Sequence, residues 1–289
     1  MSSANNLNVL VLGGSRHIGY HAALRLLGTG ATVTFLLRNP SCFDSDTEIQ
    51  KYVSSKNVNL VKGDATVRSD VQNVWDVATA GGESPVHVVL CTIGFSGSPS
   101  FNILKGVQIS PPNLLTLSLL NLFSTMPPST SSDTTSPKFV IISATGVNQK
   151  SRAAAPILLR PLYSYAIQGP LQDKHGAERV VSVLGGWNWD SDIPEPEDQI
   201  LDRAGKWLET EGMPKAGTLK NVVVVRPALL DDGECRADKV TGKAPYRVGE
   251  GEVGGWSVSR KDVAHFVVEM VRSEAKWDAY KDRQISIAY

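Results

Sequence analysis

Short and almost wholly apolar runs recur along the 289-residue chain, and segments with helical periodicity separate them. Apolar runs without polar alternation are typical of parallel strands that are buried on both faces of a sheet. On this basis we predict strands at Asn8–Leu12, Thr32–Leu37, Val58–Lys62, Val86–Thr92, Lys138–Ser143, Val222–Arg226 and Gln284–Ala288.

The intervening segments predict amphipathic helices, and the last of them begins after Ser259, a suitable N-cap. Strands that alternate with helices predict an α/β fold. We expect a doubly wound, mostly parallel sheet with helices on both faces and a small substrate-side region toward the C-terminus, in one domain over residues 1–289. The predicted helices are His17–Leu27, Ser69–Ala80, Pro112–Phe123, Pro170–Val183 and Arg260–Val271.

Two segments interrupt the alternation. Residues 126–137, MPPSTSSDTTSP, are typical of a solvated loop. The insertion at Trp187–Lys220 is acidic, and five apolar residues in it share a helical face. This insertion is either an extra surface helix packed on the domain or a lid over a substrate cleft. The five residues are Ile200, Leu201, Ala204, Trp207 and Leu208.

A glycine turn, GGSRHIG at 13–19, joins the first predicted strand to the first predicted helix. Glycine lets the backbone turn tightly and lets phosphate oxygens approach without a Cβ in the way. In this position a pyrophosphate would meet the N–H groups of the helix terminus, so the turn predicts a dinucleotide site. The expected contacts are Gly13, Ser15, Arg16, His17, Ile18 and Gly19.

The second predicted strand indicates which dinucleotide is bound. An NAD site usually has an acid about twenty residues after the glycines, to bind the ribose 2′-hydroxyl. Here Arg38 stands nineteen residues after Gly19, with no Asp or Glu between them. An arginine pairs with a 2′-phosphate, and Arg16 supplies a second guanidinium to the same group. The cofactor is therefore predicted to be NADPH or NADP, unless both arginines are ordinary surface residues.

Composition excludes several other classes of function. Lys plus Arg and Asp plus Glu both total 29, so no bulk charge attracts nucleic acid or an anionic membrane. The three cysteines have no disulfide or zinc-site spacing, and we expect no metal site. The N-terminus lacks the build of a signal peptide, and no apolar run approaches a membrane span. We expect a cytoplasmic protein with a small-molecule substrate and a possible homodimer.

The turn resembles the GGTRFIG and GATGFIG turns of extended and atypical short-chain dehydrogenase/reductases. Further stretches are similar to the NmrA-like and flavin-reductase-like NAD(P)-binding branch, namely LVKGDAT (60–66), VVLCTIG (88–94), FVIISATGV (139–147), APILLRPLYSYAIQGPLQDKHGAE (155–178), VVVVRPALLDDGE (222–234) and GWSVSRKDVAHFVV (255–268). The resemblance covers most of the chain. It implies a Rossmann fold, and it implies that the cofactor also contacts Asp64, Ala65, Cys91, Thr92, Ile93, Gly94, Lys174 and Pro227.

The chain departs from the wider superfamily in its candidate chemistry. The usual proton donor is a Tyr followed four residues later by a Lys, but Ile167 follows Tyr163 and Gly169 follows Tyr165 at that spacing. By resemblance, Lys174 takes the place of the lysine that contacts the nicotinamide ribose. Alternatively, Lys174 is a surface lysine paired with Glu178.

Several neighbouring residues have both a chemical and a structural interpretation. Ser143 at the end of the fifth strand is a second catalytic candidate, or only a hydroxyl that caps the loop. We expect His175 to be exposed and Asp173 to favour the N-terminal end of its own helix. Tyr163 and Tyr165 either border a substrate pocket or pack in the interior.

Two functions from different classes remain open. The first is an NADPH-dependent reductase that transfers hydride to a small conjugated or carbonyl-bearing acceptor, such as a quinone, an enone or a flavin. Such acceptors delocalise the arriving charge and need less from the protein than an isolated ketone. The second is a non-catalytic NmrA-like sensor that binds NADP(H). A sugar-nucleotide epimerase is disfavoured by Arg38 and by the missing tyrosine.

Overall fold

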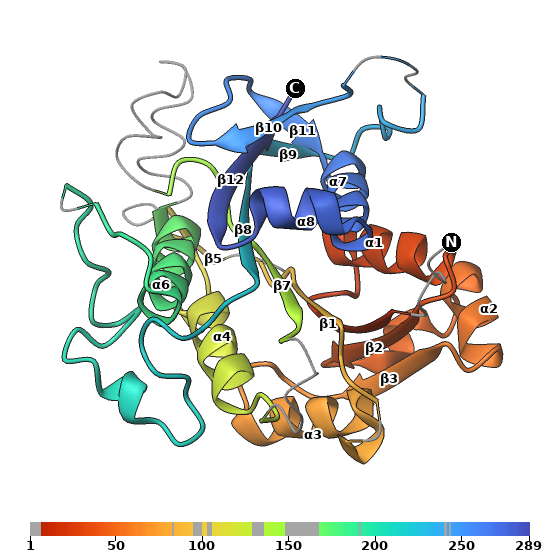
Figure 1. Ribbon diagram of the computed structural model, residues 1–289, viewed down its shortest axis with the longest axis horizontal. Coiled ribbons are helices and arrows are strands. Elements are labelled where there is room, and N and C mark those ends of the chain that lie inside the picture. Colours follow the sequence, from red (N-terminus) through yellow and green to blue (C-terminus); the bar gives the residue numbers. More distant parts are fainter. Residues whose placement is uncertain are drawn as a thin grey trace.

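A mostly parallel sheet of eight strands forms the centre of the protein, whose computed structural model describes residues 7–82, 84–94, 100–102, 106–128, 136–147, 168–190, 192–239, 242 and 244–289 (Figure 1). The strand order is β10-β12-β8-β7-β4-β1-β2-β3, and β10 pairs antiparallel with β12. The strands are β1 (Asn8–Leu12), β2 (Thr32–Leu37), β3 (Val58–Lys62), β4 (Val88–Cys91), β7 (Lys138–Ile142), β8 (Val222–Pro227), β10 (Arg247–Glu250) and β12 (Arg283–Ala288).

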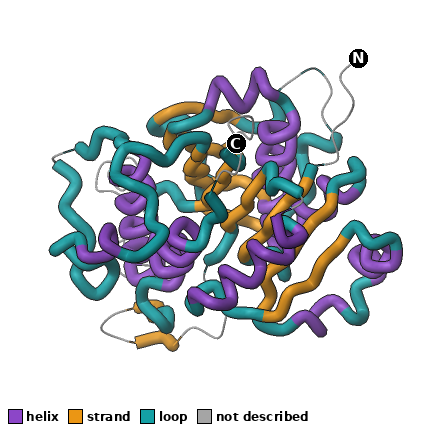
Figure 2. Tube along the Cα trace, turned by 60° about the horizontal axis from the view of Figure 1, so that its bottom comes forward, coloured by secondary structure: helices purple, strands orange, loops and turns teal. Residues whose placement is uncertain are grey.

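Helices cover both faces of this sheet, because successive strand residues point to opposite sides. Val9 and Val11 join the hydrophobic core beneath α1, α7 and α8, whereas Leu10 and Leu12 join the core beneath α3, α4 and α6. Figure 2 shows the strands running between these helices. The doubly wound α/β fold expected from the sequence is confirmed. The helices are α1 (His17–Leu27), α3 (Arg68–Ala78), α4 (Leu114–Ser124), α6 (Gln168–Gly185), α7 (Arg260–Arg272) and α8 (Glu274–Tyr280).

The predicted bounds of β1, β2, β3 and α1 agree with the structure, and the other predicted elements differ by a few residues at their ends. Elements with little apolar patterning were not predicted. One is α2 (Thr47–Ser54), in which Ile49 is the buried residue. The others are α8, the edge strand β10, the pair β9 (Leu229–Asp231) and β11 (Ser257–Ser259), and the pair β5 (Ser100–Asn102) and β6 (Gly106–Gln108).

Asp173 caps a neighbouring helix, which corrects the expectation that it favours the start of its own. The helix α6 begins five residues before it, and its carboxylate accepts hydrogen bonds from the backbone N–H groups of Leu115 and Thr116, at 2.7 and 2.9 Å. These groups open α4, whose own N-cap residue, Asn113, makes no side-chain cap. Because Asp173 is 4% exposed, these hydrogen bonds take the place of those to water.

The insertion contains no α-helix along the expected apolar face. Residues 192–220 form turns and one short 3₁₀ helix, Lys206–Glu209. Asp202 explains the difference, because its carboxylate accepts from the N–H groups of Ala204 and Lys206, both at 3.0 Å. Asp side chains that bond nearby amides compete with a helix for them. Of the five apolar residues, Ile200 and Leu201 are buried, Trp207 is half-buried, and Ala204 and Leu208 are exposed.

Some expectations fall outside the described residues. Tyr163 and Tyr165 lie there, as do residues 129–135 of the predicted 126–137 loop. Within the described part of the chain, no helix combines the length and apolar character that crossing a membrane requires.

We predict that Asp173→Ala lowers the free energy of unfolding by about 2 kcal/mol, because it leaves two buried amides of α4 without acceptors. Urea unfolding measures this change. Asp46→Ala is the matched control, since Asp46 caps two amides of the peripheral helix α2 in the same way. Its loss should be about 1 kcal/mol. An equal or smaller loss at Asp173 would contradict the capping role.

Candidate functional site

The turn between β1 and α1 packs directly against the end of β4. Gly13 has a φ of +85°, and a Cβ on it would lie 2.6 Å from the amide nitrogen of Ile93. A Cβ on Gly19 would lie 2.3 Å from Oγ1 of Thr92, which itself donates to the Gly13 carbonyl at 2.9 Å. Both positions therefore require glycine. β1 and β4 are neighbouring strands, and the strand order reverses between them. Doubly wound sheets bind ligands outside the carboxyl ends of the strands at such a point.

The N-terminus of α1 lies beside this point, and the first N–H groups of a helix have no partner within the helix itself. Its N-cap residue, Arg16, makes no side-chain cap, and Ser15, Arg16 and His17 are exposed while Ile18 is buried. Helix N-termini in this state bind anions through their N–H groups and the helix dipole. The turn thus has the geometry that phosphate binding needs.

An ion pair borders the same N-terminus. Oδ1 of Asp232 lies 2.9 Å from Nη1 of Arg260 and 3.8 Å from Nδ1 of His17. Partial burial and the charge of Arg260 lower the pKa of His17, so its imidazole is mostly neutral at pH 7. Sequence reasoning missed Asp232 and Arg260, because nothing in the spacing of the chain brings residues so distant in sequence to the glycine turn.

Arg38 follows β2 at the same edge of the sheet as the turn. Leu36 pairs with Leu12 in the parallel β1–β2 ladder, so the chain leaves both strands in the same direction. Arg16 and Arg38 are exposed, and within the described part of the chain neither guanidinium makes a hydrogen bond or an ion pair. Both are therefore available to an anionic ligand at this edge.

Asp64 and Ala65, after β3, make hydrogen bonds that stabilise the turn in which they lie. Oδ1 of Asp64 accepts from the N–H and the hydroxyl of Thr66, at 2.9 and 2.8 Å. The carbonyl of Ala65 accepts from Nδ2 of Asn121 at 3.0 Å, which ties this turn to α4. Their expected contact with the cofactor stays a prediction.

The end of β4 lies between β1, which leads into the glycine turn, and β7, which leads to Ser143. Cys91 is fully buried, and burial raises the pKa of its thiol to about 12, so the thiol stays neutral and unreactive. Thr92, Ile93 and Gly94 follow it and are half-buried at the edge of the sheet. This segment lies against the glycine turn, as the expected cofactor contacts require.

Lys174 projects from α6 toward the strand ends. Its Nζ donates to the main-chain carbonyl of Ser143 at 2.6 Å, just beyond β7. Burial lowers the pKa of Lys174 to about 8, although Asp173, Glu178 and Cys91 partly oppose the shift. The alternative of a surface lysine paired with Glu178 is wrong, since that carboxylate binds other partners.

Glu178 links Ser143 to β8. Its Oε1 accepts from Oγ of Ser143 at 2.6 Å and from Nε of Arg226 at 2.8 Å, while its Oε2 accepts from a second nitrogen of the same guanidinium. Glu178 and Ser143 are 2% and 1% exposed, so this is a buried network. The N–H of Thr145 donates to the carbonyl of Pro227 at 2.9 Å and joins the next turn to the end of β8.

Sequence reasoning missed the roles of Glu178 and Arg226. The available signal was a single charge, Arg226, at the end of the otherwise apolar run VVVVRP. A buried charge needs a partner, but the sequence did not show which acid supplies it.

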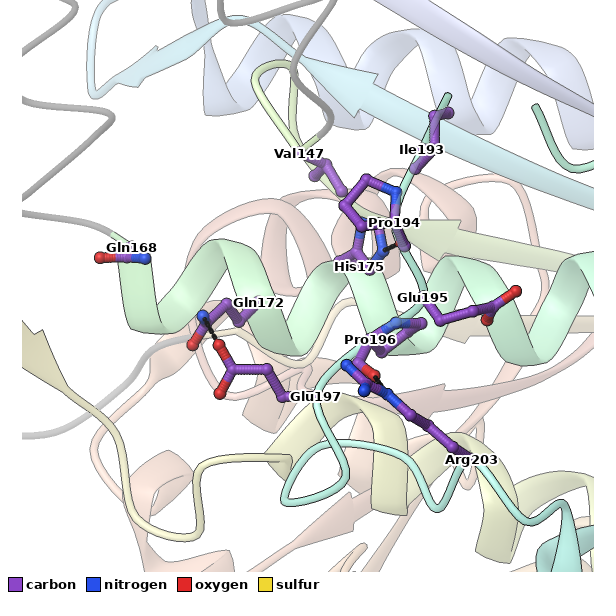
Figure 3. Close-up of a pocket in the computed structure, with 10 residues that line it drawn as sticks. All are labelled: Val147, Gln168, Gln172, His175, Ile193, Pro194, Glu195, Pro196, Glu197 and Arg203. Carbon is purple, nitrogen blue, oxygen red and sulfur yellow. Dashed lines mark hydrogen bonds between the residues drawn. The ribbon is translucent and has the colours of Figure 1, made fainter. Parts of the chain in front are cut away.

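A cavity of about 270 Å³ lies on another side of α6, under residues 192–203, which we call the strap. Figure 3 shows Val147, from the loop after β7, facing α6 across it. The carbonyl of Pro194 lies 2.8 Å from Nε2 of His175, and Nε2 of Gln172 donates to Glu197 at 2.5 Å. His175 is only 9% exposed, which corrects the expectation that it is exposed.

The strap and Lys174 occupy different sides of α6. Gln172, His175 and Arg179 contact the strap, and the guanidinium of Arg179 pairs with Glu195 at 2.7 Å. Consecutive helical residues point about 100° apart, so Lys174 is turned away from this face and toward β7. The insertion packs on the domain as an irregular segment, and a role as a lid stays a prediction.

Comparison with known proteins agrees with this architecture. No protein-family model matches the chain. The chain is 27% identical over 270 residues to the reductase pytE of Aspergillus terreus, covering 91% of this chain and 90% of that protein.

Solved structures share the fold at low identity. A short-chain oxidoreductase of Pseudomonas aeruginosa, with NADPH bound and an atypical catalytic center, is 12% identical, with a TM-score of 0.59 over 98% of this chain and 96% of that one. A short-chain dehydrogenase of Burkholderia cenocepacia, in complex with NADP, is 15% identical, with a TM-score of 0.51 over 94% and 93%. The fold that the resemblance to short-chain dehydrogenase/reductases implied is confirmed.

We predict that Gly19→Ala lowers the free energy of unfolding by about 2 kcal/mol, because its Cβ would overlap Thr92. Gly28→Ala, at the other end of α1, is the control. Gly28 has a φ of −60°, and its nearest neighbours would lie 3.4 Å from a Cβ, so this change should be neutral or slightly stabilising. Urea unfolding of both variants checks the difference, and equal effects would refute the close approach.

Proposed function

We propose that this protein is an NADPH-dependent oxidoreductase that transfers hydride to a small conjugated or carbonyl-bearing acceptor. One observation carries the proposal. The glycine turn and Lys174 lie at the same carboxyl edge of the sheet, on the two sides of the point where the strand order reverses. The similarity to a reductase along nine-tenths of the chain supports it.

The donor set at the glycine turn fits a dinucleotide. Gly13 and Gly19 leave a cradle that a Cβ would fill, and the N–H groups that open α1 have no side-chain cap. Arg16 and Arg38 are the cations expected to bind a 2′-phosphate, which an acid at the end of β2 would repel. Two structural neighbours hold NADPH or NADP, which supports this choice of cofactor.

Lys174 is the residue that we assign to the chemistry. When bound, NADPH supplies the hydride. The Lys174 ammonium, held on the Ser143 carbonyl, would stabilise negative charge that develops on the acceptor and release a proton to it. Its pKa of about 8 suits this role, because the amine is mostly protonated at pH 7 yet gives up its proton readily.

The missing tyrosine limits the acceptors that we propose. An isolated ketone needs a strong proton donor as the hydride arrives, whereas quinones, enones and flavins spread the charge over a conjugated system. Ser143 does not replace the tyrosine, because its hydroxyl donates to Glu178. Conjugated acceptors are therefore the proposed substrate class.

The missing tyrosine and the bonded Ser143 hydroxyl favour a second candidate, a non-catalytic sensor that binds NADP(H). A site without the tyrosine and with its serine hydroxyl already bonded retains cofactor binding and lacks two of the usual groups for catalysis. In that case, Lys174→Ala would leave the function with a partner intact in the presence of cofactor. In the reductase, Lys174 is required for turnover.

We predict that the protein binds NADPH at least about tenfold more tightly than NADH (~1.4 kcal/mol). Arg38→Ala should remove most of this preference by weakening NADPH alone, since NADH has no 2′-phosphate. Equilibrium titrations with both nucleotides measure it. Arg272→Ala, an equal charge change at the far end of α7, is the control. Absence of nucleotide binding would overturn both candidate functions.

We predict that Lys174→Met lowers kcat/KM at least about 100-fold while NADPH affinity changes much less. In the wild type, kcat/KM should fall as the pH rises through about 8, because the protonated amine is then lost. NADPH oxidation with a panel of quinones, enones and flavins measures both effects. Lys276→Met, an exposed lysine on α8, is the control. Undiminished turnover by Lys174→Met would exclude the proposed role.

A further inference from the structure

A buried ion pair lies directly behind the proposed catalytic lysine. Glu178 of α6 and Arg226 of β8 make a two-point contact. Burial alone would lower the pKa of Arg226, but the charge of the Glu178 carboxylate and the hydrogen bond to it raise this pKa above its ordinary value. Their side chains are 2% and 15% exposed. A pair of this kind costs desolvation, and apolar residues of similar size would often stabilise the fold as well. Stability alone therefore does not account for it.

The pair reaches Lys174 through one residue. Oε1 of Glu178 accepts the Ser143 hydroxyl at 2.6 Å, and the Ser143 carbonyl accepts Nζ of Lys174 at 2.6 Å. The hydroxyl proton of Ser143 is used in this contact, so it is not available to an acceptor. Ser143 therefore serves as a link, held at its side chain by Glu178 and holding Lys174 at its carbonyl.

We infer that Glu178, anchored by Arg226, is a positioning residue that fixes Ser143 and thereby places and tunes the Lys174 ammonium. This inference rests on the proposed function for its catalytic meaning. The placement itself rests on the hydrogen bonds of the described residues. Glu178 touches no reacting atom and acts through Ser143 and Lys174.

Each element around Lys174 contributes a different group. Asp173 and Glu178 come from its own helix, and Cys91 comes from β4. The Ser143 carbonyl lies just beyond β7, and Arg226 of β8 stands behind Glu178. The Asp173 carboxylate is held by the amides of α4, and the Cys91 thiol is neutral.

Glu178 is thus the neighbouring acid that reaches Lys174 through Ser143, and Arg226 compensates its charge. Removal of the carboxylate leaves the arginine uncompensated. A nearby positive charge disfavours the protonated amine, so the pKa of Lys174 must fall.

The decisive experiment titrates Lys174 directly, without relying on turnover. In protein labelled with [¹⁵N]lysine, the Nζ resonance is assigned by its loss in Lys174→Arg, and its pKa is compared in the wild type and in Glu178→Gln. We expect a fall of about one pH unit in the variant. The fall of kcat/KM with rising pH should move to lower pH by the same amount.

Two further variants separate positioning from general stability. Glu195→Gln removes an acid of the strap that pairs with Arg179 on another side of α6, and should leave the Lys174 pKa unchanged. Arg226→Lys keeps the charge but loses the two-point contact. It should lower kcat several-fold with little change in KM or in the Lys174 pKa, and it is also the variant to use where Glu178→Gln does not fold.

The outcomes distinguish this inference from the proposed function. If Glu178→Gln moves the Lys174 pKa no more than Glu195→Gln does, or if Arg226→Lys retains full kcat, the inference is overturned. If the pKa falls as expected but the wild type oxidises NADPH with none of the acceptors, the reductase proposal fails while the tuning of Lys174 by Glu178 is upheld.

Discussion

The close approach of the β1–α1 turn to the end of β4 is the constraint on which the rest of the site depends. Gly13 and Gly19 leave no room for a Cβ, and the Thr92 hydroxyl, just after β4, donates to the Gly13 carbonyl of the turn. This contact places the N-terminus of α1 at the point where the strand order reverses. It also fixes β4 beside β1, and β4 in turn pairs with β7, whose end carries Ser143. The glycine turn at one side of the candidate site and Lys174 at the other are therefore aligned through β4, which pairs with β1 on one side and with β7 on the other.

The layered architecture could be predicted because a strand buried on both faces of a sheet is apolar at nearly every position, as in the runs VVVV and VLVL. The elements that were missed bury little. In α2, Ile49 alone is buried, and a helix on one buried side chain has no readable period. The helix expected in the insertion at Trp187–Lys220 is absent for a different reason. The apolar spacing of the insertion fits a helix, but Asp198 and Asp202 take up backbone amides within turns, and periodicity does not register that competition.

The candidate site divides in the same way. Residues that directly follow a strand, such as Arg38 and Ser143, could be placed at one edge from the chain order alone. The partners of α6 could not. Asp173, Lys174 and His175 are consecutive, yet they contact α4, the end of β7 and the strap. The sequence of a helix shows that consecutive side chains point in different directions, but it does not show which element of the fold each side chain meets. The Glu178–Arg226 pair could not be predicted either, because its residues are 48 positions apart and the sequence does not show that α6 packs against β8 at this point.

Anchorage by three consecutive residues has a mechanical consequence for α6. A helix held on one side rolls or slides when a ligand presses on it, whereas a helix held on three sides breaks contacts in whichever direction it rotates. Gly176, the next residue, tightens this arrangement, because a Cβ there would lie 2.6 Å from Thr116 and 2.4 Å from Ile200. If Lys174 protonates the acceptor as proposed, other parts of the molecule must adapt to acceptors of different shape, because the position of the amine is fixed. On that proposal the protein would tolerate variety in the acceptor and little variation in the position of the proton donor.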